Sequence, residues 1–255
     1  MGNPTTMADI FPKAMFSVPS WVIPGTYLEN LRFLENKTDI RGVELLFFIY
    51  DSEIRLQLNA EWEGILQFKD RFVFTAHLPD PLLPEHEELV ERLDPLARSF
   101  VAHPGPAENA PALAALLKDW EKKYPPRSGF PGAPPPGRFL AENTHVGRLD
   151  ALLPYLGSMG LCMDTGHLLL EGKSPADYFR AHRERIGEIH LHGIDREKAA
   201  LDGRLADHRA VQAREEWFRE LFPLLREFAG VINTEVFSWE EAAAGMERIK
   251  LFADA

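Results

Sequence analysis

The sequence contains a single cysteine, Cys162, among 255 residues. One cysteine excludes an intramolecular disulfide, and such sparing use is typical of proteins from a reducing compartment. Because Cys162 lies inside an apolar run, we expect it to be a small buried core residue rather than a reactive thiol.

Long hydrophobic runs and a basic leader are also missing. No stretch approaches the roughly 20 apolar residues that a membrane span requires. Residues 1–11 carry no positively charged segment followed by an apolar one, so a secretory signal is not expected. The sequence therefore predicts a soluble, cytoplasmic protein with no membrane partner.

Positive charge is in short supply. There are 28 Lys and Arg residues against 39 Asp and Glu residues, and the formal net charge is −11. An acidic chain is repelled by polyanions, which argues against nucleic acid as a partner. The composition, 45% hydrophobic and 26% charged, suits one globular barrel or two small domains with a large core.

Short apolar runs alternate with amphipathic segments along the whole chain. The apolar runs predict strands at residues 16–23, 42–50, 71–77, 99–103, 138–143, 160–164, 187–192 and 230–236. Helical spacing predicts helices at residues 27–36, 54–68, 84–97, 110–123, 148–156, 175–185, 211–229 and 239–251. This alternation predicts a parallel sheet, and eight units in a chain of this length predict one α/β domain, a (β/α)8 TIM barrel over residues 1–255.

Two features bear on this prediction. An open doubly wound sheet is the alternative, but the first turn, Pro24-Gly25, lacks the glycine-rich sequence expected there. The Pro/Gly-rich segment 124–137 follows a predicted helix and precedes a predicted strand. We interpret it as a stiff loop at the end of the barrel away from the chemistry, not as a domain linker.

Residues of metal-ligand type end most of the predicted strands or follow them closely. They are His77, His103, Glu142, Asp164, His167, His190, Asp207, His208 and Glu235. The carboxyl ends of parallel barrel strands share one rim, and the strand period of two points these side chains inward. One such residue is more often hydrogen-bonded or solvated than a ligand, but so many at one rim would be costly to desolvate without cations. Mixed imidazole and carboxylate ligands predict two or three divalent ions, zinc or manganese, with iron as a further possibility.

Some polar residues near this rim have other expected roles. His192 shares a strand face with His190 and is expected to orient a ligand or contact the substrate. Arg148, Arg204 and Arg209 are candidate ligands for an anionic phosphate, although such residues are usually solvated. Glu44, in the second predicted strand, is expected to be structural.

These residues resemble the xylose isomerase-like TIM barrel superfamily, which includes the endonuclease IV type of AP endonuclease (AP endonuclease family 2). The likeness runs from about residue 17 to 239, and its most specific pieces are Thr75-Ala76-His77, Val101-Ala102-His103-Pro104-Gly105, Glu142-Asn143-Thr144, Asp164-Thr165-Gly166-His167, Ile189-His190-Leu191 and Thr234-Glu235. The resemblance implies one metal on His77, His103 and Glu142, and a second on Glu142, Asp164, His190 and Glu235. It implies a third on His167, Asp207 and His208. The family separates that last acid and histidine by one residue, whereas here they are adjacent.

Within the superfamily, the sequence is similar to the cobamide-remodelling phosphodiesterases. The similar pieces are Ser20-Trp21-Val22-Ile23-Pro24, Glu29-Asn30-Leu31-Arg32-Phe33-Leu34, Val43-Glu44-Leu45-Leu46-Phe47-Phe48, His190-Leu191-His192-Gly193 and Asp207-His208. The resemblance implies a hydrolase that cleaves the nucleotide-loop phosphodiester of cobamides, a small-molecule substrate, into an α-riboside and cobinamide phosphate. Glu142, Asp164 and Glu235 would carry the catalysis as metal ligands.

Three other functions stay open at this point. A divalent-metal sugar isomerase or epimerase would need one ion, on Glu142, Asp164, His190 and Glu235. An AP endonuclease-like DNA repair enzyme fits the resemblance, but not the net charge of −11. A non-catalytic protein that binds metal or a cobamide would show the same residues.

Overall fold

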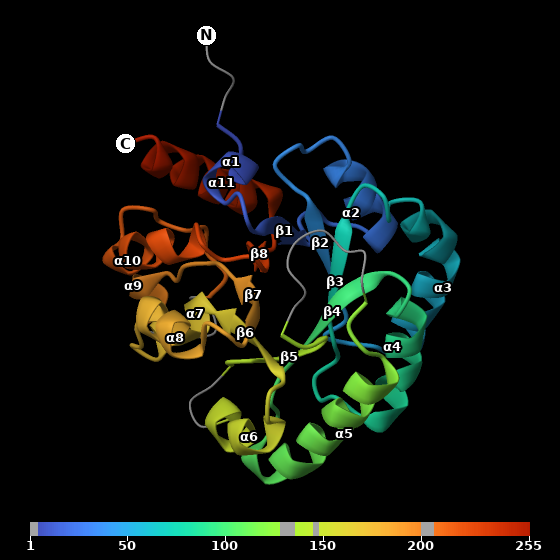
Figure 1. Ribbon diagram of the computed structural model, residues 1–255. Helices are drawn as coiled ribbons and strands as arrows, with labels where there is room; N and C mark the ends of the chain where they lie inside the picture. Colours follow the sequence, from blue (N-terminus) through green and yellow to red (C-terminus); the bar gives the residue numbers. More distant parts are fainter. Residues whose placement is uncertain (1–4, 128–135, 145–147, 200–206) are drawn as a thin grey trace.

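The computed structural model describes residues 5–127, 136–144, 148–199 and 207–255. Eight parallel strands form a closed barrel in sequence order, with β8 paired to β1 (Figure 1). They are β1 (Met15–Pro19), β2 (Gly42–Leu46), β3 (Val73–His77), β4 (Ala97–Ala102), β5 (Phe139–Glu142), β6 (Gly160–Asp164), β7 (Ile186–His190) and β8 (Val231–Asn233). The predicted α/β class and (β/α)8 architecture are confirmed.

Helices surround this ring (Figure 1). They are α1 (Met7–Ile10), α2 (Tyr27–Leu34), α3 (Ser52–Leu66), α4 (Glu87–Leu93), α5 (Ala110–Lys123), α6 (Arg148–Leu156), α7 (Thr165–Leu170), α8 (Pro175–His182), α9 (Arg196–Ala199), α10 (Glu216–Leu225) and α11 (Trp239–Ala253), with 3-10 turns at Pro84–His86 and Ala107–Asn109. Local sequence sets several of their first residues. Thr26 and Glu29 form a capping box at α2, and Ser238 caps α11 by accepting the backbone N–H of Glu241.

Several strands end earlier than the sequence predicts. β1 ends at Pro19 rather than residue 23, and β2 at Leu46 rather than residue 50. A strand lasts only as long as its neighbours offer hydrogen-bonding partners, and the last β2–β3 pair is Leu46 with His77. The residues beyond it become loops at the carboxyl end of the barrel. α10 is likewise shorter than the predicted segment 211–229, whereas α7 was not predicted.

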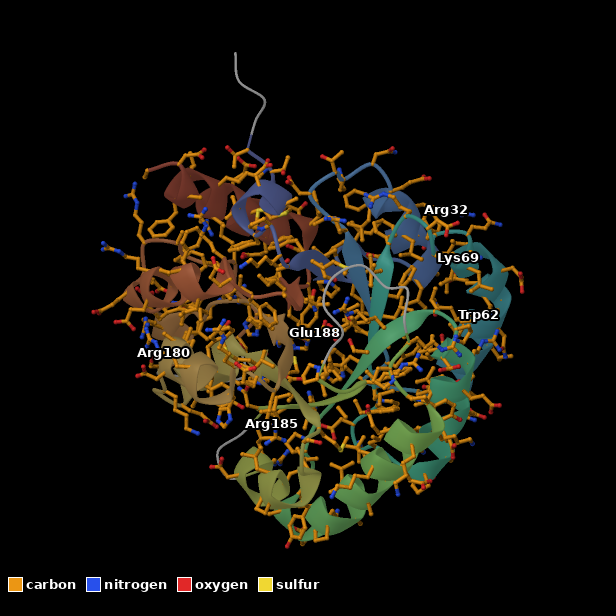
Figure 2. All side chains as sticks on the ribbon, in the orientation of Figure 1. Arg32, Trp62, Lys69, Arg180, Arg185 and Glu188 are labelled. Carbon is orange, nitrogen blue, oxygen red and sulfur yellow. The ribbon has the colours of Figure 1, made fainter. Side chains whose placement is uncertain are left out.

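The barrel interior is part apolar and part polar. Val101, Leu140 and Cys162 pack together inside it, and further interior positions hold buried polar side chains, among them Ser17, Glu44, Thr75, Ser99, Glu188 and Asn233. Glu188 lies near the middle of the ring (Figure 2), where it accepts a hydrogen bond from the Thr75 hydroxyl at 2.9 Å. Burial raises the pKa of the Cys162 thiol, which agrees with the predicted core role.

Two other predictions from the sequence concern the Pro/Gly-rich segment 124–137 and the absence of a membrane span. Of the segment 124–137, residues 128–135 lie outside the described part of the chain. Across the described ranges, each helix is too short or too polar to pass through a lipid bilayer.

Candidate metal centre

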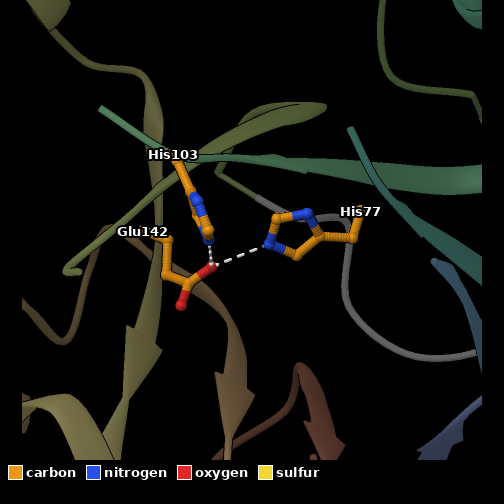
Figure 3. Close-up of side chains that lie close together, drawn as sticks. All are labelled: His77, His103 and Glu142. Atoms are coloured by element: carbon orange, nitrogen blue, oxygen red, sulfur yellow. Dashed lines mark hydrogen bonds and ion pairs between the residues drawn. The ribbon is translucent and has the colours of Figure 1, made fainter. Parts of the chain in front are cut away.

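The carboxylate of Glu142 lies at the centre of the predicted site. It ends β5, is 1% exposed, and faces two groups of side chains with its two oxygens. Oε2 lies 3.0 Å from His77 Nε2 and 3.4 Å from His103 Nε2 (Figure 3). Strands β3, β4 and β5 are neighbours, so their ends bring these three residues together as predicted. Imidazole nitrogens converging on one carboxylate oxygen form a ligand set suited to zinc or manganese.

The second group shares Glu142 and adds residues from the ends of β6, β7 and β8. His190 Nδ1 lies 3.1 Å from Glu235 Oε2, 3.6 Å from Glu142 Oε1 and 3.9 Å from Asp164 Oδ2. All four residues are buried, and their ligand-type atoms lie within 4.8 Å of one another. Because its two oxygens serve different groups, Glu142 has the geometry of a bridging carboxylate.

The third group gathers around Asp207. One of its carboxylate oxygens lies 3.2 Å from His167 Nε2 and 4.0 Å from His208 Nε2, and the other lies 3.3 Å from His192 Nδ1. His208 reaches this place with a left-handed backbone (φ 54°), which is uncommon outside glycine and clusters at functional sites. The adjacent acid and histidine of this chain thus both reach the site. Their ligand role stays a prediction.

Most site histidines are held from behind in the same way. Nδ1 of His77, His167 and His208 lies 3.0 Å from a backbone carbonyl oxygen, of Leu78, Asn143 and Glu235 respectively. Nδ1 of His103 lies 2.9 Å from the Asp80 carboxylate. These oxygens can only accept hydrogen bonds, so each Nδ1 carries a proton and each Nε2 faces the site, where a cation would take the place of the Nε2 proton. Metal-binding histidines are oriented in this manner.

The electrostatics of the site call for cations. Burial by itself would lower the pKa of His167, but the charge of Asp164 and hydrogen bonds with Asp207 and Glu142 raise it to about 12. Burial also opposes protonation of His103, yet Glu142 and Asp80 raise the pKa of this residue to about 9. Protons on imidazoles therefore supply the positive charge that buried carboxylates need.

Buried polar atoms without hydrogen-bond partners also indicate that the site binds cations. Among the described residues, the buried His190 Nδ1 and Glu235 Oε2 have no hydrogen bond of acceptable geometry. A buried polar atom without a partner is costly, and a bound cation would satisfy both. The residues present therefore fit divalent metal ions.

The four predicted substrate-binding residues differ in where the structure places them. His192 is completely buried and lies 2.9 Å from Asp164 Oδ2, a position that suits orienting this acid rather than touching a substrate. Arg148 begins α6 and lies near Asp80, whose pKa is held down by its hydrogen bond with His103 and, more weakly, by the charge of Arg148. Arg209 directly follows His208, and Arg204 lies outside the described residues.

Sequence reasoning missed three residues of the site's surroundings. Asp80 supports His103, and Asn143 clamps β6 by accepting the N–H of Asp164 at 2.8 Å and donating to its carbonyl oxygen at 2.9 Å. Glu44, expected to be structural, lies 3.3 Å from His190. Asp80 follows His77 by three residues in a Pro-flanked loop, which offered a weak signal. The signal for Glu44 was its position as an acidic residue inside an apolar predicted strand, where its side chain would be buried.

Comparison with known proteins gives a likeness of fold. No protein-family model matches the sequence, and no curated protein resembles it significantly. A xylose isomerase domain containing protein from Salmonella typhimurium LT2 matches with 18% identity and a TM-score of 0.61, over 95% of either chain. The IolI protein, solved with a zinc atom, matches with 13% identity and a TM-score of 0.62, over 94% of this chain and 95% of that one.

Endonuclease IV from Thermus thermophilus matches with 15% identity and a TM-score of 0.58, over 94% of this chain and 99% of that one. Other matches of this kind are described as sugar phosphate isomerases or epimerases. At such low identity these likenesses concern the fold. The chain therefore folds as a xylose isomerase-like TIM barrel, as its motifs predicted.

Proposed function

We propose that this protein is a metal-dependent phosphodiesterase that cleaves the nucleotide-loop phosphodiester of cobamides to an α-riboside and cobinamide phosphate. The observation that carries the proposal is the presence of three ligand-type groups around one barrel mouth. A single-ion enzyme needs only the group of Glu142, Asp164, His190 and Glu235. The histidines of the two flanking groups supply further positions that phosphodiester chemistry uses.

Divalent ions, when bound, stabilise charge on phosphate oxygens and lower the pKa of a bound water. The chain's own residues hold the carboxylate and imidazole groups in place before the substrate binds. Glu142, Asp164 and Glu235 keep buried negative charge in place, and the anchored imidazoles need no reorganisation when the substrate arrives. Arg148 and Arg209, near the same rim, are proposed to bind the non-bridging phosphate oxygens.

An exposed apolar rim supports a substrate larger than a sugar. Trp21, Ile49 and Phe237 are 42%, 66% and 41% exposed and follow the adjacent strands β1, β2 and β8. The Phe237 ring lies 4.6 Å from the ring of His208, so the rim continues into the third group. Large exposed apolar side chains mark binding surfaces, and these would contact the corrin part of a cobamide while its phosphate lies at the metals.

Product analysis tests the proposal. The purified protein, loaded with zinc or manganese, is incubated with cobalamin, and the products are separated by liquid chromatography and identified by mass. We expect an α-riboside and cobinamide phosphate; failure to release the riboside with zinc, manganese or iron would overturn the assignment. Trp21→Ala should raise KM for cobalamin, whereas Leu251→Ala, which truncates an exposed apolar side chain on α11, should leave KM unchanged.

A sugar isomerase or epimerase is the second candidate. The four-residue group is complete by itself, and solved proteins of this fold include sugar phosphate isomerases or epimerases. One bound ion per chain together with turnover of a ketose would favour this function. Incision of abasic duplex DNA would instead favour a DNA repair enzyme, which the net charge of −11 argues against.

A further inference from the structure

His190 is held in the opposite sense to the histidines around it. The rings of His77, His103, His167 and His208 have Nδ1 bound from behind and Nε2 toward the site. His190 instead turns Nδ1 toward Glu235, Glu142 and Asp164, so its Nε2 points away from them. A ring in this orientation needs its acceptor at Nε2.

The group behind His190 is the carboxylate of Glu44. Glu44 Oε1 lies 3.3 Å from His190 Nε2, an ion-pair distance without hydrogen-bond geometry, and these two completely buried atoms have no hydrogen-bond partner among the described residues. Glu44 Oε2 accepts a hydrogen bond from Asn233 Nδ2 at 2.5 Å, and Asn233 is the register partner of His190 on the neighbouring strand β8. Asn233 therefore hydrogen-bonds one oxygen of this carboxylate, and the ring of His190, from the adjacent strand, lies beside the other oxygen.

The other buried carboxylate of this layer has different partners. Glu188 Oε1 accepts from the Thr75 hydroxyl at 2.9 Å, and Oε2 accepts from the Ser99 hydroxyl at 3.3 Å. Both of its oxygens are thus engaged by hydroxyl groups. Within the described ranges, the carboxylate oxygen within 4.0 Å of His190 Nε2 is that of Glu44.

We propose that Glu44 is a positioning residue that keeps the proton of His190 on Nε2 and directs the Nδ1 lone pair into the metal centre. The inference rests on the proposed metal site and extends it below the rim, into the barrel. A neutral imidazole has one donor and one acceptor nitrogen, and a carboxylate can only accept. Glu44 therefore selects the tautomer in which Nδ1 is free to bind a cation, as Asp80 selects the opposite tautomer for His103.

Zinc titration of Glu44 variants tests the inference. Glu44→Leu removes the acceptor and should weaken one zinc site by about 10- to 100-fold, the usual effect of losing such a partner. Glu44→Gln keeps an acceptor but no charge, so its zinc affinity should fall between that of Glu44→Leu and that of the wild type. Thr75→Val is the matched control, because Thr75 is the register partner of Glu44 on the neighbouring strand β3. This substitution removes a buried hydrogen bond, to Glu188, without changing the surroundings of His190 Nε2. Its zinc affinity should stay within about twofold of the wild type, even where its melting temperature falls.

Nitrogen-15 NMR of the zinc-loaded wild-type protein reports the tautomer directly, with Glu44 in place. The His190 resonances, assigned by comparison with His190→Gln, should show zinc on Nδ1 and the proton on Nε2. Zinc on Nε2, or Glu44→Leu with wild-type zinc affinity, would overturn the role of Glu44 while leaving the metal centre intact. A wild-type protein that binds no zinc or manganese would overturn the proposed function together with this inference.

Discussion

Replacing Glu142 by Gln removes one charge from the side chain that faces two ligand groups. The side chain is 1% exposed, and its oxygens lie 3.0 Å from His77 Nε2 and 3.6 Å from His190 Nδ1. Removing one member of a buried, hydrogen-bonded charge pair costs about 3–5 kcal/mol. At about 1.4 kcal/mol for each tenfold change, metal affinity should fall by roughly two to four powers of ten. Because Glu142 touches both groups, two ions should be weakened together.

Chelator competition and elemental analysis measure this effect. Glu121→Gln is the matched control, because Glu121 accepts the backbone N–H groups of Arg138 and Phe139 at the opposite end of β5. That control should lower thermal stability and leave metal binding intact. If Glu142→Gln weakens one ion and leaves the other unchanged, Glu142 does not bridge; if it weakens neither, the assignment of this rim as a metal centre is wrong.

Three further predictions follow from the same structure. Gly166→Ala places a Cβ 2.1 Å from His192 Cε1, so it should cost about 1–3 kcal/mol of stability by overpacking and lower the zinc stoichiometry. Gly172→Ala meets no atom within 4 Å but is strained by a φ of +68°, so it should lose some stability and retain full zinc content in the same assay. With free metal at about 1,000 times its Kd, binding should add about 4 kcal/mol to the free energy of unfolding. Removing the metal with a chelator should therefore lower the melting temperature by about 8–16 °C, measured by calorimetry, and an unchanged melting temperature would contradict tight binding. Burial raises the pKa of Tyr27 above its unfolded value of about 10, and its hydroxyl donates to the Leu46 carbonyl at 2.8 Å. The unfolded state therefore ionises first, and this group should contribute a loss of about 1.4 kcal/mol per pH unit as the pH rises above about 10; Tyr27→Phe should lose stability less steeply in alkaline unfolding, and an equal slope would refute this.

The architecture was predictable because its determinants are local and repeated. Each buried strand of a parallel barrel reads as a continuous apolar run, and each helix shows a one-sided period, as in α5 and α6, whose predicted bounds match the structure. Parallel strands share one rim, so ligand-type residues at strand ends had to converge there. His77, His103 and Glu142 do so.

Tertiary structure alone decided how these side chains face one another. Ring orientation depends on acceptors from other strands or loops, such as Asp80 behind His103 and Glu44 behind His190, and sequence order does not encode which strand ends stand opposite. His192 likewise lies beside Asp207 because the tertiary structure brings these two parts of the chain together. The sequence by itself determined the barrel and the set of ligand-type residues, because burial and strand period act within short segments. The grouping of those residues, and the choice of nitrogen on each ring, were set by barrel closure and by contacts between distant parts of the chain.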